Sequence, residues 1–297
     1  MQFLDVKTDY AFKKVFGSEE SKDILISFLN SIVEFENNLQ IKDLDILDPY
    51  NMPMLHGVKA TYVDIKAKLD DDSLVIIEMQ VVNQSDFQKR VLYNAAKNYS
   101  LQLKKGESYH LLNPVIALSI LDFEMFKDSD KMITNFKLLE KEDFTLYSDD
   151  IELIFVELPK FNKLFEECKD IKDKWIYFIK NAGNLEVMPK NIPNEQKQAY
   201  EIINQANLTE EELEFQRKRV DFVNMVKGAE QFSFDKGEKK GIEKGIEQGI
   251  EKERLNSEKK IASEKLNLAK NLLDILDDET IALKTGLDIA AVASLRL

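Results

Sequence analysis

Two short apolar runs joined by a polar turn constrain the fold of this chain more than any other feature. Residues 62–67 and 75–80 each have the composition of a β-strand, and the Asp-Asp-Asp-Ser stretch at 70–73 between them is typical of a turn. Each run carries one acid in apolar surroundings, Asp64 in the first and Glu78 in the second. The sequence therefore predicts a β-hairpin that holds two carboxylates.

This pair of carboxylates predicts a metal site. A buried carboxylate is costly without a compensating positive charge, and two that a hairpin brings together repel each other unless a cation lies between them. Side chains alternate along a strand, so Glu78 and Gln80 share a face, and Asp64 can face Glu78 across the hairpin. Mg²⁺ prefers oxygen ligands and typically takes one or two carboxylates with water and substrate phosphate. We therefore expect Asp64 and Glu78 to hold Mg²⁺ or Mn²⁺, with Gln80 beside the ion.

The residues of the hairpin resemble a known nuclease motif. The segment 59–80 is similar to the D…ExK core of the PD-(D/E)XK nuclease superfamily, with Asp64 and Glu78 at the acidic positions and Gln80 where a lysine usually stands. A narrower resemblance is to the Rpn family of recombination-promoting nucleases and putative transposases. The matching residues are Asp9-x-x-Phe12-Lys13-x-x-Phe16-Gly17, the segments 59–67 and 77–80, then Phe87, Arg90, Tyr93, Tyr99, Gln102, Gly106 and Tyr109, and the apolar run 114–121.

The resemblance implies both a fold and an activity. The fold would be α/β, a restriction-endonuclease-like mixed sheet flanked by helices, followed by a mostly helical C-terminal region. The activity would be metal-dependent endonucleolytic cleavage of DNA, linked to recombination or transposition-like processing. Asp64, Glu78 and Gln80 would be catalytic, and Asp9 on the first helix would complete the site. Gln80 departs from the superfamily pattern, because a neutral amide can orient a water molecule but cannot neutralise charge on a phosphate.

Purely structural roles for the same acids stay open at this point. Asp64 can pair with Lys66 or Lys68, and Glu78 with Lys59, across the sheet. Asp9 also suits the N-terminus of a helix, where the dipole favours an acid. The chain can then be a catalytically inactive nuclease-fold protein that acts as a DNA-binding or oligomerising adaptor, or an interaction protein that works through its tail.

The net charge limits how DNA would bind. The chain has 54 acidic and 41 basic residues, a balance of −13, whereas DNA binding depends on neutralising phosphates with Lys and Arg. Between residues 59 and 105, however, eight basic residues face six acidic ones, a local balance of +2. We expect the DNA contacts to come from this region. The candidates are Arg90, Lys89, Lys66 and Lys97, and the alternative for the helical ones is an ordinary solvated face.

The compartment follows from what the sequence lacks. Cys168 is the single cysteine, so no internal disulfide can form. The first residues do not have the pattern of a signal peptide, and no run approaches the roughly 20 apolar residues that span a bilayer. We expect a cytoplasmic protein without a membrane partner.

Hydrophobic periodicity predicts the order of the remaining elements. We expect helices at 18–36, 85–104, 161–182 and 194–232, and strands at 39–47, 114–121, 134–139 and 151–158. Trp175 and Phe178 are expected to be core aromatics. The predicted domains are a nuclease core at 1–160, a helical region at 161–235, and a charged glycine-repeat helix with a terminal helical hairpin at 236–297.

The tail contains a short repeat in which every fourth residue is glycine. Gly237, Gly241, Gly245 and Gly249 would line one side of a helix, at a cost of about 1 kcal/mol each in helix propensity. We expect a homo-oligomer to form through this segment, and the alternative is a flexible helical linker. Residues 278–295 resemble a helix-turn-helix, but Arg296 is the one basic residue at its second helix, so a packing or oligomerising hairpin is favoured over a DNA reader.

Overall fold

The computed structural model of the protein describes residues 2–35, 39–51 and 61–296. They form two compact units, and the chain passes from the first to the second between Lys227 and Gly228. Within the described ranges, no helix is both long enough and apolar enough to cross a membrane. The sequence also predicts domain boundaries near residues 160 and 235. Those boundaries describe parts that fold independently, and they stay a prediction.

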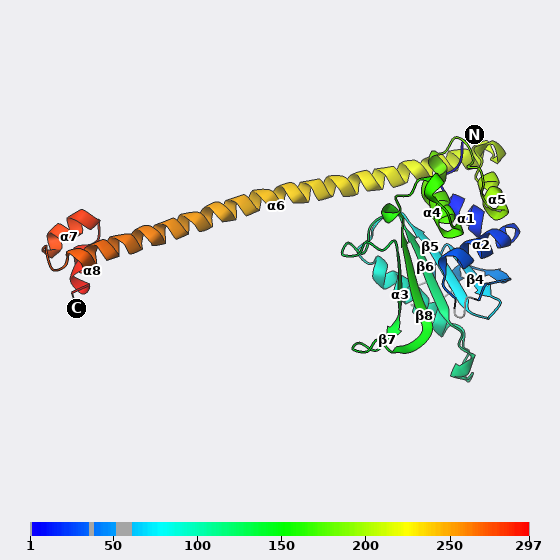
Figure 1. The fold of residues 1–297 in the computed structure, drawn as a ribbon, viewed down its shortest axis with the longest axis horizontal. Coiled ribbons are helices and arrows are strands. Elements are labelled where there is room, and N and C mark those ends of the chain that lie inside the picture. The colour runs from blue at the N-terminus through cyan, green and yellow to red at the C-terminus, as the bar shows by residue number, and fades with distance from the viewer. Residues whose placement is uncertain (1, 36–38, 52–60, 297) are drawn as a thin grey trace. The chain divides into compact units, whose positions relative to one another are not determined.

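A mixed sheet of six strands lies at the centre of the first unit (Figure 1). Its order is β1 (Leu44–Leu47), β4 (Ile65–Leu69), β5 (Leu74–Gln80), β6 (Val115–Leu121), β8 (Leu146–Glu157) and β7 (Ile133–Leu139). β5, β6 and β8 are parallel, and the other pairs are antiparallel. β2 (Tyr50–Asn51) and β3 (Thr61–Tyr62) form a separate ribbon. The predicted mixed α/β sheet is confirmed.

The predicted hairpin is formed by β4 and β5. Ile65 pairs with Ile77, and the turn at 70–73 is closed by the side chain of Asp71, which accepts a hydrogen bond from the Ser73 N–H (3.0 Å). Asp72 takes a positive φ of 67° in this turn, a conformation that aspartate tolerates better than most residues. β5 and β6 are buried along nearly their whole length, as expected of central parallel strands.

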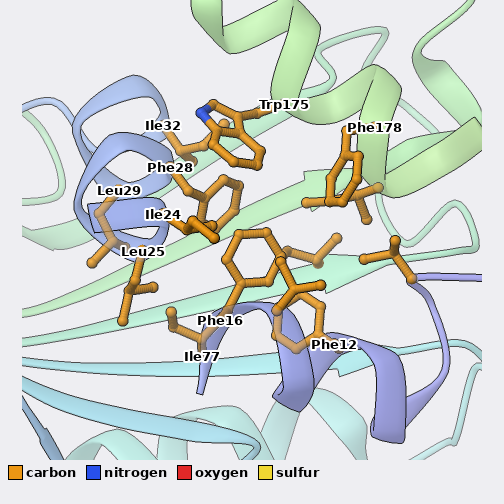
Figure 2. Packing of buried hydrophobic residues seen from close by; sticks show 14 of the residues in the cluster. Phe12, Phe16, Ile24, Leu25, Phe28, Leu29, Ile32, Ile77, Trp175 and Phe178 are labelled. Atoms are coloured by element: carbon orange, nitrogen blue, oxygen red, sulfur yellow. The ribbon is translucent and has the colours of Figure 1, made fainter. Parts of the chain in front are cut away.

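Four helices cover one face of the sheet: α1 (Asp9–Phe16), α2 (Lys22–Ile32), α4 (Ile171–Asn181) and α5 (Asn194–Ile202). Their apolar side chains form the larger core, in which the rings of Phe16, Phe28 and Trp175 meet above Ile77 (Figure 2). Trp175 and Phe178 are fully buried, which confirms that they are core aromatics.

A single helix, α3 (Phe87–Ser100), packs on the other face of the sheet. Phe87, Val91 and Ala95 are buried there together with Ile76 of β5. Because strand side chains alternate, Glu78 follows Ile76 onto this same face. The apolar stripe that the sequence predicts for this helix is therefore confirmed, although the helix is shorter than predicted.

Several elements are shorter than the sequence predicts. The helix expected at 18–36 is a short 3₁₀ turn, η1 (Glu19–Ser21), followed by α2, and the strand expected at 39–47 is reduced to β1. α4 begins only after Asp170, which caps it by accepting from the Asp173 N–H (2.7 Å). Further 3₁₀ turns are η3 (Tyr109–Leu111), η4 (Leu158–Lys160), η5 (Phe165–Glu167) and η6 (Ala182–Asn184).

The helix predicted at 194–232 is wrong as one element. α5 ends at Ile202, η7 (Gln205–Asn207) follows, and a new helix, α6 (Glu210–Leu272), begins. Thr209 and Glu212 form a reciprocal cap at this start: the Glu212 N–H donates to Thr209 Oγ1 (3.2 Å), and the Thr209 N–H donates to Glu212 Oε2 (2.8 Å).

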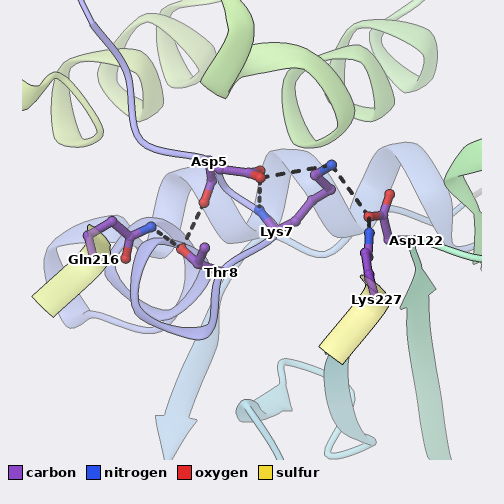
Figure 3. Close-up of polar contacts among 6 residues, drawn as sticks. All are labelled: Asp5, Lys7, Thr8, Asp122, Gln216 and Lys227. Carbon is purple, nitrogen blue, oxygen red and sulfur yellow. Dashed lines mark hydrogen bonds and ion pairs between the residues drawn. The ribbon is translucent and has the colours of Figure 1, made fainter. Parts of the chain in front are cut away.

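The first turns of α6 are fastened to the N-terminal segment of the chain. Gln216 donates a hydrogen bond to the hydroxyl of Thr8, and the ammonium of Lys227 lies 2.6 Å from Asp122 (Figure 3). Lys7 approaches the same Asp122 oxygen at 3.4 Å. Asp122 directly follows β6, so these contacts tie α6 to the end of the sheet at which β5 also ends.

The second unit contains the rest of α6, α7 (Asp278–Thr285) and α8 (Ile289–Ser294). Gly286 ends α7 with a left-handed φ of 67°, and Ala269, Ile281 and Val292 form a small core. The predicted terminal hairpin is confirmed. The guanidinium of Arg296 bonds to Asp278 (2.6 Å) and to the backbone carbonyls of Leu273 and Leu276 between α6 and α7. This residue therefore holds the hairpin to the end of α6.

Candidate active site

The carboxylate of Asp64 takes part in the hydrogen bonding between β4 and β5. The backbone N–H of Asp64 donates to the carbonyl of Ile77 (3.1 Å), and the N–H of Met79 donates to Asp64 Oδ2 (2.8 Å). The side chain of Asp64, the residue just before β4, thus accepts a hydrogen bond from a backbone N–H of β5. Asp64 therefore lies beside the end of β5, next to Ile77 and Met79.

A lysine from α1 joins two acids at this end of the hairpin. Lys13 Nζ lies 2.8 Å from Asp9 Oδ1 and 3.4 Å from Asp64 Oδ1. Asp9 and Lys13 share one face of α1 because they are four residues apart, while Phe12 and Phe16 hold the helix on the core from the other side. Two segments that are distant in the sequence therefore present two carboxylates and one ammonium to each other.

The two acids in this group have opposite pKa shifts. Burial raises the pKa of Asp64 to about 7, supported by a hydrogen bond with the neighbouring Asp9 carboxyl and opposed by the Met79 N–H and Lys13. Burial also acts to raise the pKa of Asp9, but hydrogen bonds with Lys13 and Asp64 outweigh it and lower that pKa. One ammonium is thus insufficient to keep both carboxyls fully ionised at neutral pH.

Glu78 lies on the α3 face, where it is 9% exposed. Asn94 Nδ2 donates a hydrogen bond to its Oε1 atom (2.7 Å), and Arg90 Nη2 lies 3.7 Å from its Oε2 atom. Burial raises the pKa of Glu78 above its usual value, and the Arg90 charge and the Asn94 hydrogen bond only partly offset this. The carboxylate is therefore costly to keep ionised in the absence of a further cation.

Gln80 is held at both ends of its amide. Its Oε1 atom accepts a hydrogen bond from Arg90 Nη2 (2.7 Å), and its Nε2 atom donates to the carbonyl of Val82 (2.7 Å). The same guanidinium donates through Nη1 to Gln84 (2.8 Å) and lies over the ring of Phe87, 5.1 Å from its centroid. Arg90 thus connects α3 with the end of β5.

The predicted DNA-binding residues differ in exposure. Lys89 is exposed, and the side chain of Arg90 is 32% exposed. Lys97 is buried, with its ammonium 6.0 Å from the centre of the Tyr93 ring, and Lys66 is half-buried with a pKa that burial lowers. Burial makes the last two less accessible to a large ligand than Arg90 and Lys89.

Of the structural pairings considered for Asp64, the one with Lys68 is replaced by a Lys68–Asp72 pair. The cation beside Asp64 is Lys13. Lys59, considered as a partner of Glu78, lies outside the described residues.

Sequence reasoning assigned no role to Lys13, Asn94 or Arg219. Arg219, on α6, is close enough to Asp9 to lower the pKa of that acid. Lys13 stands four residues after Asp9 and Asn94 four after Arg90, so the helical spacing was available as a signal. No comparable signal connects Arg219 with the first helix.

The carboxylate oxygens of Asp64 and Glu78 are the kind of ligand that Mg²⁺ prefers, and such an ion commonly takes its other ligands from water or substrate. Within residues 2–35, 39–51 and 61–296, no three His, Cys, Asp or Glu side chains gather closely enough to hold a metal ion by themselves. An ion at Asp64 and Glu78 would therefore need further oxygen donors, as Mg²⁺ commonly finds in water and substrate phosphate. The raised pKa values of both acids fit a site that lacks positive charge.

Comparison with known proteins identifies the family of the chain. The model of a family described as PD-(D/E)XK nuclease family transposase matches residues 6–229. The matched range includes every site residue from Asp9 to Arg219 and confirms the resemblance seen in the sequence. No curated protein and no solved structure matches the chain.

Proposed function

Because the chain belongs to the PD-(D/E)XK nuclease family of transposases, we propose that it is a metal-dependent DNA endonuclease that acts in recombination or transposition-like processing. Family membership supports a nuclease-type function and DNA as the substrate. The observation that carries the finer proposal is that half-buried Asp64 and buried Glu78, both at the same end of the hairpin, have raised pKa values. Acids with perturbed pKa values are typical of functional sites.

Asp64 and Glu78 would hold Mg²⁺ or Mn²⁺, together with the backbone carbonyl of Met79. When bound, the metal would polarise the scissile phosphate and lower the pKa of an attacking water molecule. Asp9 would keep Lys13 close to Asp64 in the absence of metal, because its ionised carboxylate attracts the same ammonium. Gln80 would orient the water through its amide.

The DNA strand would lie along the end of β5 and the start of α3. Arg90 and Lys89 are the accessible cations there, and Lys66 and Lys97 complete the proposed set. With one divalent ion added, the local charge near the hairpin becomes more positive than the sequence balance indicates. Affinity for DNA should still be modest and should fall with salt, because the whole chain is strongly acidic.

Cleavage of supercoiled plasmid at low salt tests the proposal. The wild type should nick the plasmid with Mg²⁺ or Mn²⁺ but not with EDTA, and Glu78→Ala should abolish nicking. Glu186→Ala, which removes an exposed carboxylate elsewhere, is the matched control and should cleave like the wild type. An intact plasmid in every metal, with DNA binding retained, would favour the inactive adaptor instead.

Self-association and a cytoplasmic location are part of the proposal. Apart from its chain neighbours and the nearby backbone of its own helix, a Cβ atom added at Gly237, Gly241, Gly245 or Gly249 would meet no described atom within 4 Å. Ile242 and Ile246 beside these glycines are exposed. This face therefore suits the helix of a second copy. The reducing cytoplasm suits a chain whose one cysteine, Cys168, is buried and free.

A further inference from the structure

Because the side chain of Gln80 is neutral, position 80 does not supply the positive charge that the proposed site needs near the substrate phosphate. In the motif that this chain resembles, a lysine at this position brings a positive charge next to the second acid. An amide can donate and accept hydrogen bonds, but it cannot offset the charge of a phosphate in the transition state. The site would need that charge from another residue.

Arg90 brings a positive charge to the position of Gln80. Its Nη2 atom lies 2.7 Å from Gln80 Oε1 and 3.7 Å from Glu78 Oε2. Both residues of β5 that point toward α3 at its end therefore contact the same guanidinium nitrogen.

The guanidinium is held firmly and is still accessible. Gln84 accepts from Nη1, and the buried ring of Phe87 lies beneath the guanidinium, so three neighbours fix its orientation. The side chain nevertheless remains 32% exposed. A guanidinium has five N–H donors, so donors remain for a phosphate oxygen in addition to those that Gln80 and Gln84 use.

The other cation of the site is less suited to this role. Lys13 lies between Asp9 and Asp64, at 2.8 and 3.4 Å, and its charge is already shared by two carboxylates. It belongs to the opposite side of the hairpin from Gln80, because α1 covers one face of the sheet and α3 the other.

We propose that Arg90 supplies from α3 the positive charge that position 80 lacks, and that Gln80 serves as the hydrogen-bond acceptor that aims this guanidinium at the scissile phosphate. Arg90 is then a catalytic residue rather than a general DNA-binding residue. It stays protonated throughout and makes only hydrogen bonds and electrostatic contacts. The inference rests on the proposed nuclease function and adds the group that stabilises charge on the substrate.

Reciprocal substitution separates this role from strand binding. Arg90→Gln should lower kcat by about 100-fold, a typical loss when one charge-stabilising donor is removed, with little change in KM. Adding Gln80→Lys to that variant should return kcat to within about tenfold of the wild type. The kcat of Arg90→Lys should lie between that of Arg90→Gln and that of the double variant. Lys105→Gln, which removes an exposed charge from the turn after α3, controls for net charge and should behave like the wild type.

Lys13→Gln provides a second comparison. Gln80→Lys should not rescue that variant, because the charge lost is on the α1 side of the hairpin. Failure of Gln80→Lys to rescue Arg90→Gln in an active enzyme, or a loss that appears in KM alone, would overturn the inference. Circular dichroism of each variant confirms that it is folded.

Mn²⁺ binding measured by titration calorimetry in the absence of DNA tests the placement of charge without relying on catalysis. Removing a cation next to Glu78 should tighten Mn²⁺ binding by on the order of tenfold, and Gln80→Lys in the Arg90→Gln background should reverse the gain. Equal affinities in all three proteins would overturn the inference. If the three proteins show the expected affinities but the wild type leaves DNA intact, the nuclease function is contradicted while the placement of the charge stands. If the wild type neither binds Mn²⁺ nor cleaves DNA, both proposals are contradicted.

Discussion

Asn94 donates a hydrogen bond of 2.7 Å to Glu78, and both side chains are buried where α3 packs on β5. The other amide atom of Asn94, Oδ1, has no hydrogen-bond partner among the described residues. The amide therefore contributes through a single bond, and that bond is directed at a proposed metal ligand. Its position allows a direct test of how Glu78 is held.

Asn94→Ala should destabilise the protein by about 1–3 kcal/mol, because the buried carboxyl of Glu78 loses a donor, and it should weaken metal-dependent cleavage. Urea unfolding and plasmid nicking measure the two effects. Asn98→Ala is the control, since Asn98 donates to the backbone of Asn94 (2.9 Å) and not to Glu78. Cleavage that falls equally in both variants would contradict a specific role for Asn94.

The raised pKa of Asp64 predicts how stability depends on pH. A carboxyl whose pKa is about 7 when folded and near 3.8 when unfolded binds more protons in the folded state between these values. Its contribution to the free energy of unfolding is therefore largest at low pH and is lost as the pH rises from about 4 to about 7. Asp64→Asn should flatten this dependence and stabilise the metal-free protein above pH 7, by on the order of 1 kcal/mol or more.

Urea unfolding in EDTA between pH 4.5 and 8 checks this prediction. Asparagine keeps an oxygen that can accept from the Met79 N–H, so the hairpin itself should be preserved. Added Mn²⁺ should stabilise the wild type at pH 8 and leave Asp64→Asn unaffected. A variant that is less stable than the wild type at pH 8 in EDTA would contradict the assigned pKa.

Asp122 should be needed to hold the start of α6. Its carboxylate lies 2.6 Å from Lys227 and 3.4 Å from Lys7, so Asp122→Asn removes this carboxylate from Lys227 and leaves Lys7 with Asp5, at 3.9 Å, as its acidic neighbour. We expect a loss of about 1–3 kcal/mol, the range for a charged group that loses a hydrogen-bond partner, and faster amide exchange in residues 210–227. Lys218→Gln breaks an exposed pair with Glu214 on the same helix and should change little. Unchanged exchange in Asp122→Asn would show that the apolar contacts of α6 suffice.

Alanine substitution in the glycine repeat distinguishes self-association from a simple linker. Each Gly→Ala change in a lone helix should add up to about 1 kcal/mol of helix stability. If a second copy packs on this face, Gly241→Ala with Gly245→Ala should instead weaken the oligomer. Sedimentation equilibrium with circular dichroism separates the two outcomes, and Gly228→Ala, in the same helix but outside the repeat, is the matched control.

The hairpin and the central strands were predictable because their signals are local. Alternation places Glu78 and Gln80 on one face, and nearly continuous apolar runs identify β5 and β6. The end of α5 and the start of α6 were missed, although Thr209 and Glu212 stand three residues apart as a capping pair. The helical pattern of residues 194–232 predicts one helix, but this capping pair starts a new helix within it.

The contacts within the site were less predictable. Lys13 meets Asp64, and Arg90 meets Gln80, only because α1 and α3 pack on opposite faces of the sheet next to β5. Nothing in the spacing of these residues specifies which cation belongs to which acid. Asp64 and Glu78 both lie at the predicted hairpin, but the assignment of their partners required the packing of the two helices.

The contacts of α1 also bear on how the chain folds during synthesis. Thr8 bonds to Gln216, and Lys14 lies 2.6 Å from Glu212, the residue that also caps the start of α6. These partners are 208 and 198 positions apart in the chain. On the ribosome, the first helix must wait until almost all of the first unit has been made before its last contacts can form, so we expect the unit to close late and all at once.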